Sequence, residues 1–135
     1  MIREYKKEDK KQIDDIGQLI KSDYIFKESE QSKCLVFEEN NIVVGFMVYL
    51  QTEDNVEIYD IAVKEEYQQN AIGTKLLTYL ELAIQASCSK IILEVRSDNE
   101  KAISFYLGKG FIKKAVRKKY YQDGENALIM IKELW

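Results

Sequence analysis

Short apolar runs alternate with segments of helical periodicity along the chain, and turn residues separate them. The apolar runs predict strands over residues 1–5, 34–37, 42–50, 56–63, 91–95, 111–121 and 127–131. Helical spacing predicts helices over 7–22, 72–87 and 100–109, and residues 24–32 form either a short helix or a loop. No linker, repeat or low-complexity stretch interrupts this series, so we predict a single domain over residues 1–135.

Two of the predicted helices have a clear apolar face. In the segment 7–22 that face is made by Ile13, Ile16, Leu19 and Ile20. In the segment 72–87 it is made by Ile72, Leu76, Leu77, Leu80, Ala83 and Ile84. Asn40-Asn41 is predicted to form a tight hairpin turn, because asparagine tolerates a positive φ. The strands 111–121 and 127–131 are predicted to form a last hairpin around Asp123-Gly124.

Composition excludes several classes of protein. No apolar run reaches the roughly 18 residues that span a bilayer, and the charged start, Met1 to Glu4, is unlike a signal peptide. Cys34 and Cys88 fit no metal-ligand spacing and no disulfide framework, which favours a reducing cytoplasm. The chain has no histidine, so any enzyme here would move protons with carboxylate, Tyr, Cys or Lys side chains.

Charge is divided unevenly along the chain. The net charge of −3 and the isoelectric point near 5.2 argue against a general nucleic-acid binder. Residues 1–60 hold 8 Lys/Arg and 14 Asp/Glu, a net charge of −6, whereas residues 61–135 hold 12 and 9, a net charge of +3. Such a division suits a cationic ligand on one half and an anionic ligand on the other, but it also arises by chance on solvated faces.

A candidate anion site follows the predicted strand 56–63. Gln68-Gln69-Asn70-Ala71-Ile72-Gly73 leads directly into a predicted helix, whose first N–H groups and partial positive charge suit a pyrophosphate. Small residues at 71 and 73 would let the backbone approach the anion. The segment is neither a Walker loop nor a Rossmann fingerprint, and its spacing alone favours a plain strand-to-helix turn.

A carboxylate interrupts the apolar strand 91–95. Side chains alternate between faces, so Glu94 shares a face with Ile92 and Arg96. A carboxylate in a buried strand is unfavourable unless it is paired or functional, and it is suited to act as a general base. The alternatives are a structural pair with Arg96 or a strand end that reaches water.

Two further polar residues belong to the last predicted helix, one at the position before it and one within it. Asn99 stands where a helix cap is expected. Tyr106 lies with Ala102 and Phe105 on the inward side, where a tyrosine is more often part of the core than catalytic. A buried tyrosine hydroxyl still needs a partner.

Three segments of the chain, taken together, resemble the GNAT superfamily of acetyl-CoA-dependent N-acetyltransferases in their order and spacing. They are Ile61-Ala62-Val63, Gln68 to Gly73, and LEVRSDNEKAISFYLGKGF (Leu93 to Phe111). The run 93–111, followed by Arg117-Lys118-Lys119-Tyr120-Tyr121, is most similar to the bacterial ribosomal-protein-alanine N-acetyltransferases. The likeness is dense over residues 56–131 and weak over 1–55. In two places the chain departs from the family pattern, since Ala71 replaces a glycine and Gln68 replaces a frequent arginine.

The resemblance implies an α/β (α+β) architecture of the GNAT type, with a central mixed, mostly antiparallel sheet that splays between strands 56–63 and 90–96 and is flanked by helices. Acetyl-CoA would be the cosubstrate, with no metal. Its pantetheine arm would pair with the backbone of Ile61, Ala62 and Val63, and Asn99 would touch this arm. Its pyrophosphate would bind the turn that begins at Gln68, on the amides of Gln69, Asn70, Ala71, Ile72, Gly73 and Thr74.

The resemblance also implies catalytic roles. Glu94 matches a general base and Tyr106 a general acid, and a backbone N–H near Val63 would hold the oxyanion. Glu57 and Asp60 are candidates for the acceptor side. The expected partners are acetyl-CoA and an amine, without nucleic acid or membrane, in a cytoplasmic monomer or homodimer. The acceptor would be a protein or peptide N-terminus; the alternatives are a small-molecule amine, or a non-catalytic CoA-binding module.

Overall fold

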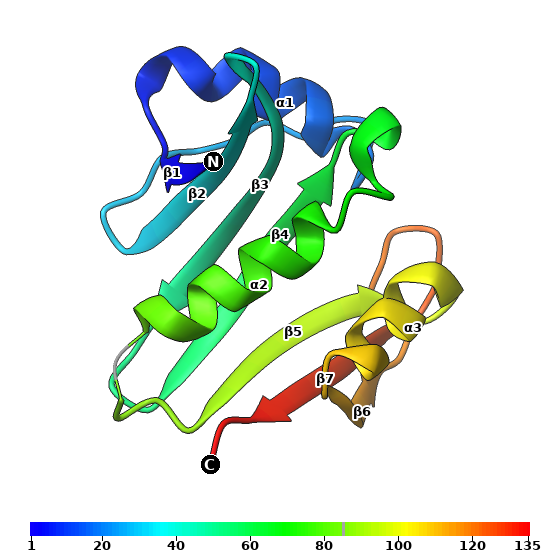
Figure 1. Cartoon of the computed structure of the whole chain (residues 1–135). Coiled ribbons are helices and arrows are strands. Elements are labelled where there is room, and N and C mark those ends of the chain that lie inside the picture. Colours follow the sequence, from blue (N-terminus) through cyan, green and yellow to red (C-terminus); the bar gives the residue numbers. More distant parts are fainter. Residues whose placement is uncertain (85) are drawn as a thin grey trace. The chain divides into compact units, whose positions relative to one another are not determined.

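The computed structural model describes residues 1–84 and 86–135. Its elements, labelled in Figure 1, are β1 (Ile2–Glu4), the 3₁₀ helix η1 (Lys7–Asp9), α1 (Lys10–Gly17), β2 (Ser32–Glu39), β3 (Ile42–Gln51), β4 (Asn55–Val63), the 3₁₀ helix η2 (Glu65–Tyr67), α2 (Ile72–Ala83), β5 (Lys90–Arg96), α3 (Glu100–Gly108), β6 (Ile112–Arg117) and β7 (Ala127–Glu133). The strands form a seven-stranded sheet in the order β1-β2-β3-β4-β5-β7-β6. β4 and β5 are parallel, and the pairs β1–β2, β2–β3, β5–β7 and β6–β7 are antiparallel. The predicted mixed, mostly antiparallel α/β fold is confirmed.

The chain divides into two compact units. One contains Met1–Leu50 and Tyr59–Ile84, and the other contains Gln51–Ile58 and Gln85–Trp135. β4 therefore contributes its second half to the first unit and its first half to the second.

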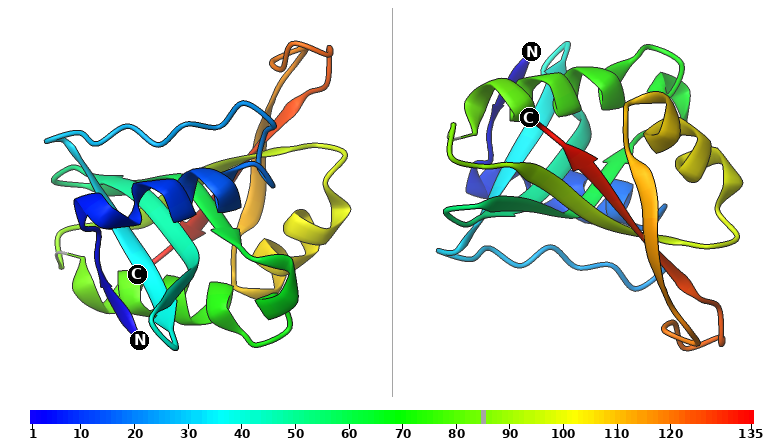
Figure 2. Two further views of the ribbon diagram at one scale, coloured as in Figure 1. Left: turned by 90° about the horizontal axis from the view of Figure 1, so that it is seen from above. Right: turned by 90° about the horizontal axis from the view of Figure 1, so that it is seen from below.

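In the first unit, helices cover both faces of the sheet. The register pairs Val36 with Phe46 and Leu35 with Met47, so each pair lies on one face. Val36 and Phe46 pack in one buried cluster with Ile13 and Ile16 of α1. On the other face α2 approaches closely, because a Cβ added at Gly45 would lie 3.2 Å from Ile72 Cγ2. Figure 2 shows α1 and α2 on opposite sides of these strands.

The helix α1 is shorter than predicted. It ends at Gly17, and Leu19 and Ile20, predicted to lie on the buried face, are 47% and 41% exposed. The loop that follows supplies the buried side chains instead, since Tyr24 and Phe26 join the α1 cluster. Gly17 packs directly against the ring of Tyr24, which leaves no room for a side chain at 17. The prediction for Leu19 and Ile20 is wrong because periodicity does not show that the helix ends at Gly17 and that Tyr24, in the following loop, fills the core.

The helix α2 also ends before the predicted residue 87. Ile72, Leu76, Leu77 and Leu80 are buried as predicted, but Ala83 is exposed. The chain leaves the helix at Ile84, which has extended dihedrals of φ −78° and ψ 158°. Residue 85 lies outside the described residues.

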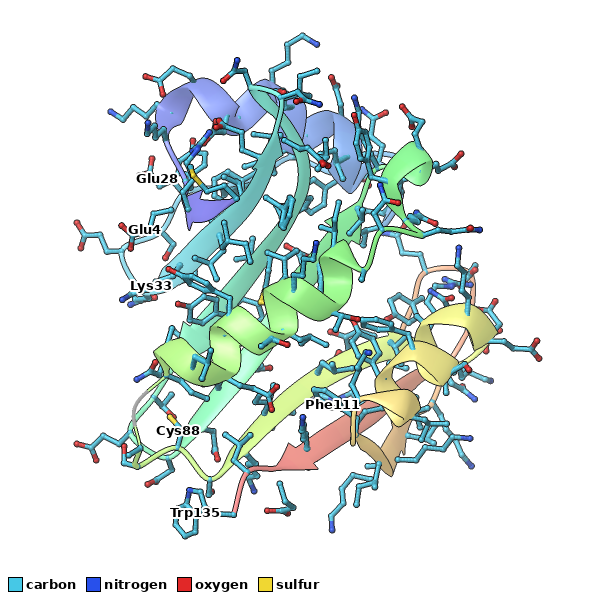
Figure 3. All side chains as sticks on the ribbon, viewed as in Figure 1. Glu4, Glu28, Lys33, Cys88, Phe111 and Trp135 are labelled. Atoms are coloured by element: carbon cyan, nitrogen blue, oxygen red, sulfur yellow. The ribbon has the colours of Figure 1, made fainter. Side chains whose placement is uncertain are left out.

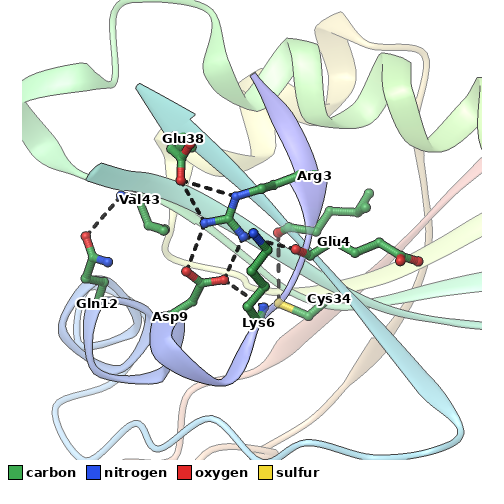
Figure 4. Close-up of polar contacts among 9 residues, drawn as sticks. Arg3, Glu4, Lys6, Asp9, Gln12, Cys34, Glu38 and Val43 are labelled. Carbon is green, nitrogen blue, oxygen red and sulfur yellow. Dashed lines mark hydrogen bonds and ion pairs between the residues drawn. The ribbon is translucent and has the colours of Figure 1, made fainter. Parts of the chain in front are cut away.

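The N-terminus is held to the sheet by a cluster of charges (Figure 4). Arg3 Nη1 lies 2.9 Å from Asp9 Oδ2, and Arg3 Nη2 lies 2.8 Å from Glu38 Oε1. The backbone N–H of Lys6 also donates to Asp9 Oδ2, at 2.8 Å. Burial raises the pKa of Asp9, but the bonds from Arg3 and Lys6 outweigh it and hold that pKa below its usual value. The cluster joins β1, η1 and β2.

In the second unit, β5 lies between the first half of β4 and β7. Its buried side chains Ile91, Leu93 and Val95 share a face, which β7 extends through Met130 and Leu128. Gly110, with φ +96°, lets the chain leave α3 above that face, close to Lys132. Tyr106 and Phe111, the latter labelled in Figure 3, are the buried residues at this end of the helix. β6 is the edge strand, and all six of its residues are exposed.

The predicted Asn40-Asn41 turn is found, but the strand predicted over residues 111–121 is shorter, since β6 ends at Arg117. Asn40 and Asn41 have φ of 53° and 65°, and Gly124 has φ of 87°. Cys34 and Cys88 are both buried, and neither forms a disulfide bond with a described residue. Burial, with smaller contributions from Asp9 and Asp60, raises the pKa of Cys34 to about 12. Among the described residues no helix is long and apolar enough to cross a membrane.

Candidate active site

The turn from β4 into α2 is tightly fixed. The N–H of Lys64 donates to the carbonyl of Val44 at 2.8 Å, which anchors the end of β4 on β3. Gln68 Nε2 donates to the carbonyl of Val63 at 3.0 Å. The side chain in the family's arginine position therefore closes the turn from within the protein.

The N-terminus of α2 presents open amide groups. The first bond of the helix runs from the N–H of Lys75 to the carbonyl of Ala71, at 3.0 Å. The N–H groups of residues 71–74 precede that bond, so helix geometry leaves them without an intrahelical acceptor. The N–H of Asn70 differs, because it donates to the carbonyl of Tyr67 at 3.1 Å. The partial positive charge of a helix N-terminus adds to the attraction for an anion.

Ala71 caps this helix in the left-handed conformation. Its φ is 59° and its ψ is 24°, and no side chain caps the helix at this position. Only glycine adopts this region without a steric penalty. The residue that departs from the family pattern therefore occupies the position where the backbone favours glycine.

The side chains of β4 point to both faces of the sheet in the first unit. Val63 Cγ2 would lie 3.4 Å from a Cβ at Gly45, on the α2 face. Ala62 instead packs against the α1 cluster. Asp60 also lies on the α1 side, where its Oδ2 accepts a hydrogen bond of 3.0 Å from the hydroxyl of Tyr24. Of the two acceptor-side candidates, Asp60 is half-buried and Glu57 is exposed.

Burial is the largest influence on the pKa values of Tyr24 and Asp60. It raises the pKa of Asp60, although the Tyr24 bond and the charge of Lys21 act in the other direction. Burial also raises the pKa of Tyr24, and the Asp60 carboxylate adds to that effect. Tyr24 therefore stays a neutral hydrogen-bond donor.

Glu94 is paired with an arginine, but not with Arg96. Its carboxylate lies 3.3 Å from Nε of Arg117 on β6, and its side chain is 25% exposed. Arg96 instead contacts Asp98 at 3.1 Å and Asp123 at 2.7 Å. The alternating burial of β5 places Glu94 on the face opposite to Leu93 and Val95.

Asn99 and Tyr106 lie at the two ends of α3. Asn99 Oδ1 accepts a hydrogen bond of 3.2 Å from the N–H of Ala102, which confirms the predicted cap. Tyr106 is 7% exposed, and its ring lies 5.3 Å and 5.4 Å from the rings of Phe105 and Phe111. Burial raises its pKa. Its hydroxyl makes no hydrogen bond to any described residue.

One hollow in the first unit lies apart from these residues. It has a volume of about 170 Å³ at the edge of β2, and its rim includes Glu4, Glu28 and Lys33 (Figure 3). None of the residues that line it belongs to the predicted cofactor site. Among the described residues, no group of three or more His, Cys, Asp or Glu could hold a metal ion.

Comparison with known proteins decides the family. Residues 2–111 match the acetyltransferase (GNAT) family. The chain belongs to this family. A relative of this GNAT chain, an uncharacterised N-acetyltransferase of Methanocaldococcus jannaschii, is 40% identical over 100 residues, which cover 73% of this chain but only 64% of the relative. The ribosomal protein bS18-alanine N-acetyltransferase of Escherichia coli strain K12 is 30% identical over 115 residues, covering 81% of this chain and 78% of that protein.

Solved structures of GNAT proteins have the same fold. Ard1 from Thermoplasma volcanium superposes with a TM-score of 0.88 at 28% identity, covering 100% of this chain and 97% of that one. The ribosomal-protein-S18-alanine N-acetyltransferase of Escherichia coli superposes with a TM-score of 0.86 at 25% identity, covering 99% and 93%. The resemblance inferred from residues 61–111 is thereby confirmed at the level of the family.

Proposed function

We propose that this GNAT chain transfers the acetyl group of acetyl-CoA to a primary amine, and that the acceptor is the N-terminus of a protein or peptide. The observation that carries the proposal is the open row of N–H groups at residues 71–74, where α2 begins. A site that offers several amides and a helix dipole fits a pyrophosphate. The names of the Escherichia coli relatives support the choice of acceptor.

The backbone of Ile61, Ala62 and Val63 is suited to pair with the pantetheine arm. The ladder between β4 and β5 joins Asn55–Ile58 to Lys90–Leu93. Ile61 to Val63 lie beyond that ladder. An N–H group in this stretch, near Val63, would stabilise the oxyanion of the tetrahedral intermediate. Asn99 has a side-chain NH₂ group that its capping bond leaves unused, and this group can donate to the same arm.

Glu94 and Tyr106 supply the proton transfers. The amine nitrogen attacks the thioester carbonyl carbon, and Glu94 accepts the proton that the nitrogen loses. The C–S bond then breaks, and Tyr106 donates its proton to the departing sulfur. Solvent returns a proton to Tyr106 and removes the one on Glu94. Arg117, 3.3 Å away, orients the Glu94 carboxylate.

The test is release of free CoA thiol from acetyl-CoA in the presence of peptides with free N-termini and of small amines. We expect release with the peptides, and a decrease in kcat of about 10²-fold in Glu94→Gln. Acetyl-CoA should raise the Tm of both proteins, because binding does not need the base. Glu133→Gln, which changes an exposed carboxylate at the end of β7, is the control.

Each outcome separates the alternatives. Release with small amines alone would make the chain a small-molecule acetyltransferase. A rise in Tm without release from any acceptor would indicate a CoA-binding module. The absence of both at millimolar acetyl-CoA would contradict the proposed function.

A further inference from the structure

The Tyr24–Asp60 pair joins two parts of the first unit that are 36 positions apart in the sequence. Tyr24 comes from the loop after α1, is 6% exposed, and packs its ring 5.7 Å from that of Phe46. Its hydroxyl donates to Asp60 Oδ2 at 3.0 Å. Because packing holds the ring of Tyr24 and its hydroxyl bonds to Asp60, the orientation of the Asp60 carboxylate is fixed.

Asp60 is a half-buried carboxylate that forms no ion pair with any described residue. Its one hydrogen bond within the described residues comes from the neutral Tyr24, and it uses Oδ2. Oδ1 makes no bond to any residue that the structure describes. Lys21 acts on Asp60 at longer range, but it is exposed and forms no ion pair with it. A desolvated carboxylate of this kind is unfavourable unless a positive charge meets it.

Asp60 occupies a distinctive place on β4. It immediately precedes Ile61, the first residue suited to pair with the pantetheine arm. Its side chain lies on the α1 face, whereas Val63 and Ile72 both lie beside Gly45 on the α2 face, where the open amides begin. A group bound at Asp60 therefore would not compete for the amides at residues 71–74.

We propose that Asp60, held by Tyr24, binds a positively charged group of the acceptor other than the nitrogen that is acetylated. This inference rests on the proposed function. The reacting nitrogen has to be neutral when it attacks, so a fixed carboxylate is matched to a second charge. The basic side chain of a peptide and the second ammonium group of a diamine both supply that charge.

The experiment compares acceptors that differ only in charge. Peptides with free N-termini would carry lysine or the neutral norleucine at the second or third position, and pentane-1,5-diamine would be compared with pentylamine. For wild-type protein we expect kcat/KM to be about tenfold or more higher with the charged member of the preferred pair, as for a charge-assisted hydrogen bond. In Asp60→Asn the ratio of kcat/KM for the charged acceptor to kcat/KM for the neutral acceptor should fall to about 1, while the KM for acetyl-CoA is unchanged.

Two variants separate recognition of charge from structural support. Tyr24→Phe keeps the ring but releases Asp60, so the ratio should fall part of the way. Asp23→Asn removes the same charge from the exposed neighbour of Tyr24 and should leave the ratio as in wild type. An equal loss with charged and neutral acceptors in Asp60→Asn would show a purely structural role and overturn the inference.

The failure of the inference is distinguishable from that of the proposed function. Release of CoA without any charge preference in wild-type protein would overturn only the role of Asp60. No release with any acceptor would overturn the proposed function, and the role of Asp60 with it.

Discussion

At the scale of single residues, Tyr106 combines a buried ring with a hydroxyl that bonds to no described residue. Tyr106→Phe keeps the packing against Phe105 and Phe111 and removes an oxygen that bonds to no described residue. We therefore expect the free energy of unfolding to change by well under about 1 kcal/mol. If the hydroxyl protonates the leaving sulfur in the slow step, kcat should fall by roughly 10² or more.

The measurement is kcat at saturating acetyl-CoA, together with a melting curve on the same sample. Tyr120→Phe is the control, because Tyr120 is 51% exposed. Normal kcat with an unshifted Tm would remove the acid role and leave the hydroxyl without a function. A decrease of only a few-fold would mean that water protonates the thiolate.

Ala71 gives a second prediction at this scale. Its φ of 59° places an L side chain in the left-handed region, which is unfavourable by roughly 1–2 kcal/mol. Ala71→Gly should therefore raise the free energy of unfolding by about 1 kcal/mol, since the entropy of glycine in the unfolded chain offsets part of the gain. Acetyl-CoA affinity should stay the same or increase slightly.

Denaturant unfolding and calorimetric titration with acetyl-CoA provide the two readouts. The control is Ala83→Gly, at the last residue of α2, where the loss of a helix former should lower stability. Weaker binding of acetyl-CoA in Ala71→Gly would mean that the anion site at the N-terminus of α2 depends on the methyl group of Ala71.

At the scale of elements, two helices end in glycine for different reasons. In α1, Gly17 packs against the ring of Tyr24, so Gly17→Ala should destabilise the fold by about 1–3 kcal/mol although alanine is the better helix former. In α3, nothing lies within 4 Å of a Cβ built at Gly108. Gly108→Ala should therefore stabilise by about 0.5–1 kcal/mol. Urea unfolding of both variants would show opposite shifts of the midpoint; shifts of the same sign would contradict this explanation.

The elements that the sequence predicts well are those set by local pattern. The strands follow from apolar runs, and the Asn40-Asn41 turn follows from residues that tolerate positive φ. The helix ends were predicted less well, because Leu19 and Ile20 continue a helical period after the chain has left α1. Tyr24, which replaces them in the core, lies in a loop whose sequence gives no such indication.

The site shows the same limit. Ala71 and Tyr106 were found by their place in a motif, but a motif shows neither the φ of Ala71 nor that the Tyr106 hydroxyl bonds to no described residue. The partner of Glu94 is Arg117, 23 positions away, and not the neighbouring Arg96. The bond from Tyr24 to Asp60 joins residues 36 positions apart. Pairs such as these depend on strand register and loop path, which local spacing does not determine.

At the scale of the whole molecule, Asp9 and Asp60 should affect acid stability in opposite directions. The pKa of Asp9 is lowered in the folded protein by Arg3 and the Lys6 N–H, which outweigh burial. Its stabilising effect is therefore complete above the ordinary carboxyl pKa and is lost as the pH falls below it. The pKa of Asp60 is raised by burial. The Asp60 carboxylate therefore destabilises the fold at neutral pH, and this effect decreases as the pH falls from the raised pKa toward the ordinary carboxyl pKa.

The corresponding variants test these signs. Asp9→Asn should lower the free energy of unfolding at pH 7 by roughly 2 kcal/mol, and the difference from wild type should shrink as the pH falls below about 4. Asp60→Asn keeps an acceptor for Tyr24 and should be more stable than wild type at pH 7, with an advantage that also shrinks in acid. Denaturant unfolding at several pH values provides the measurement. Parallel curves for a variant and wild type would show that its carboxylate does not set the pH dependence.

The two buried thiols make this protein convenient to assay. Disulfide reagents such as Ellman's attack thiolates, and Cys34, with a pKa of about 12, has almost none at neutral pH. Cys88 is only 2% exposed. Colour that develops with native protein and acetyl-CoA should therefore report released coenzyme, with little background from the enzyme. In denaturant the same reagent should titrate two equivalents per chain, so one chromogenic reaction can follow both turnover and the loss of native structure.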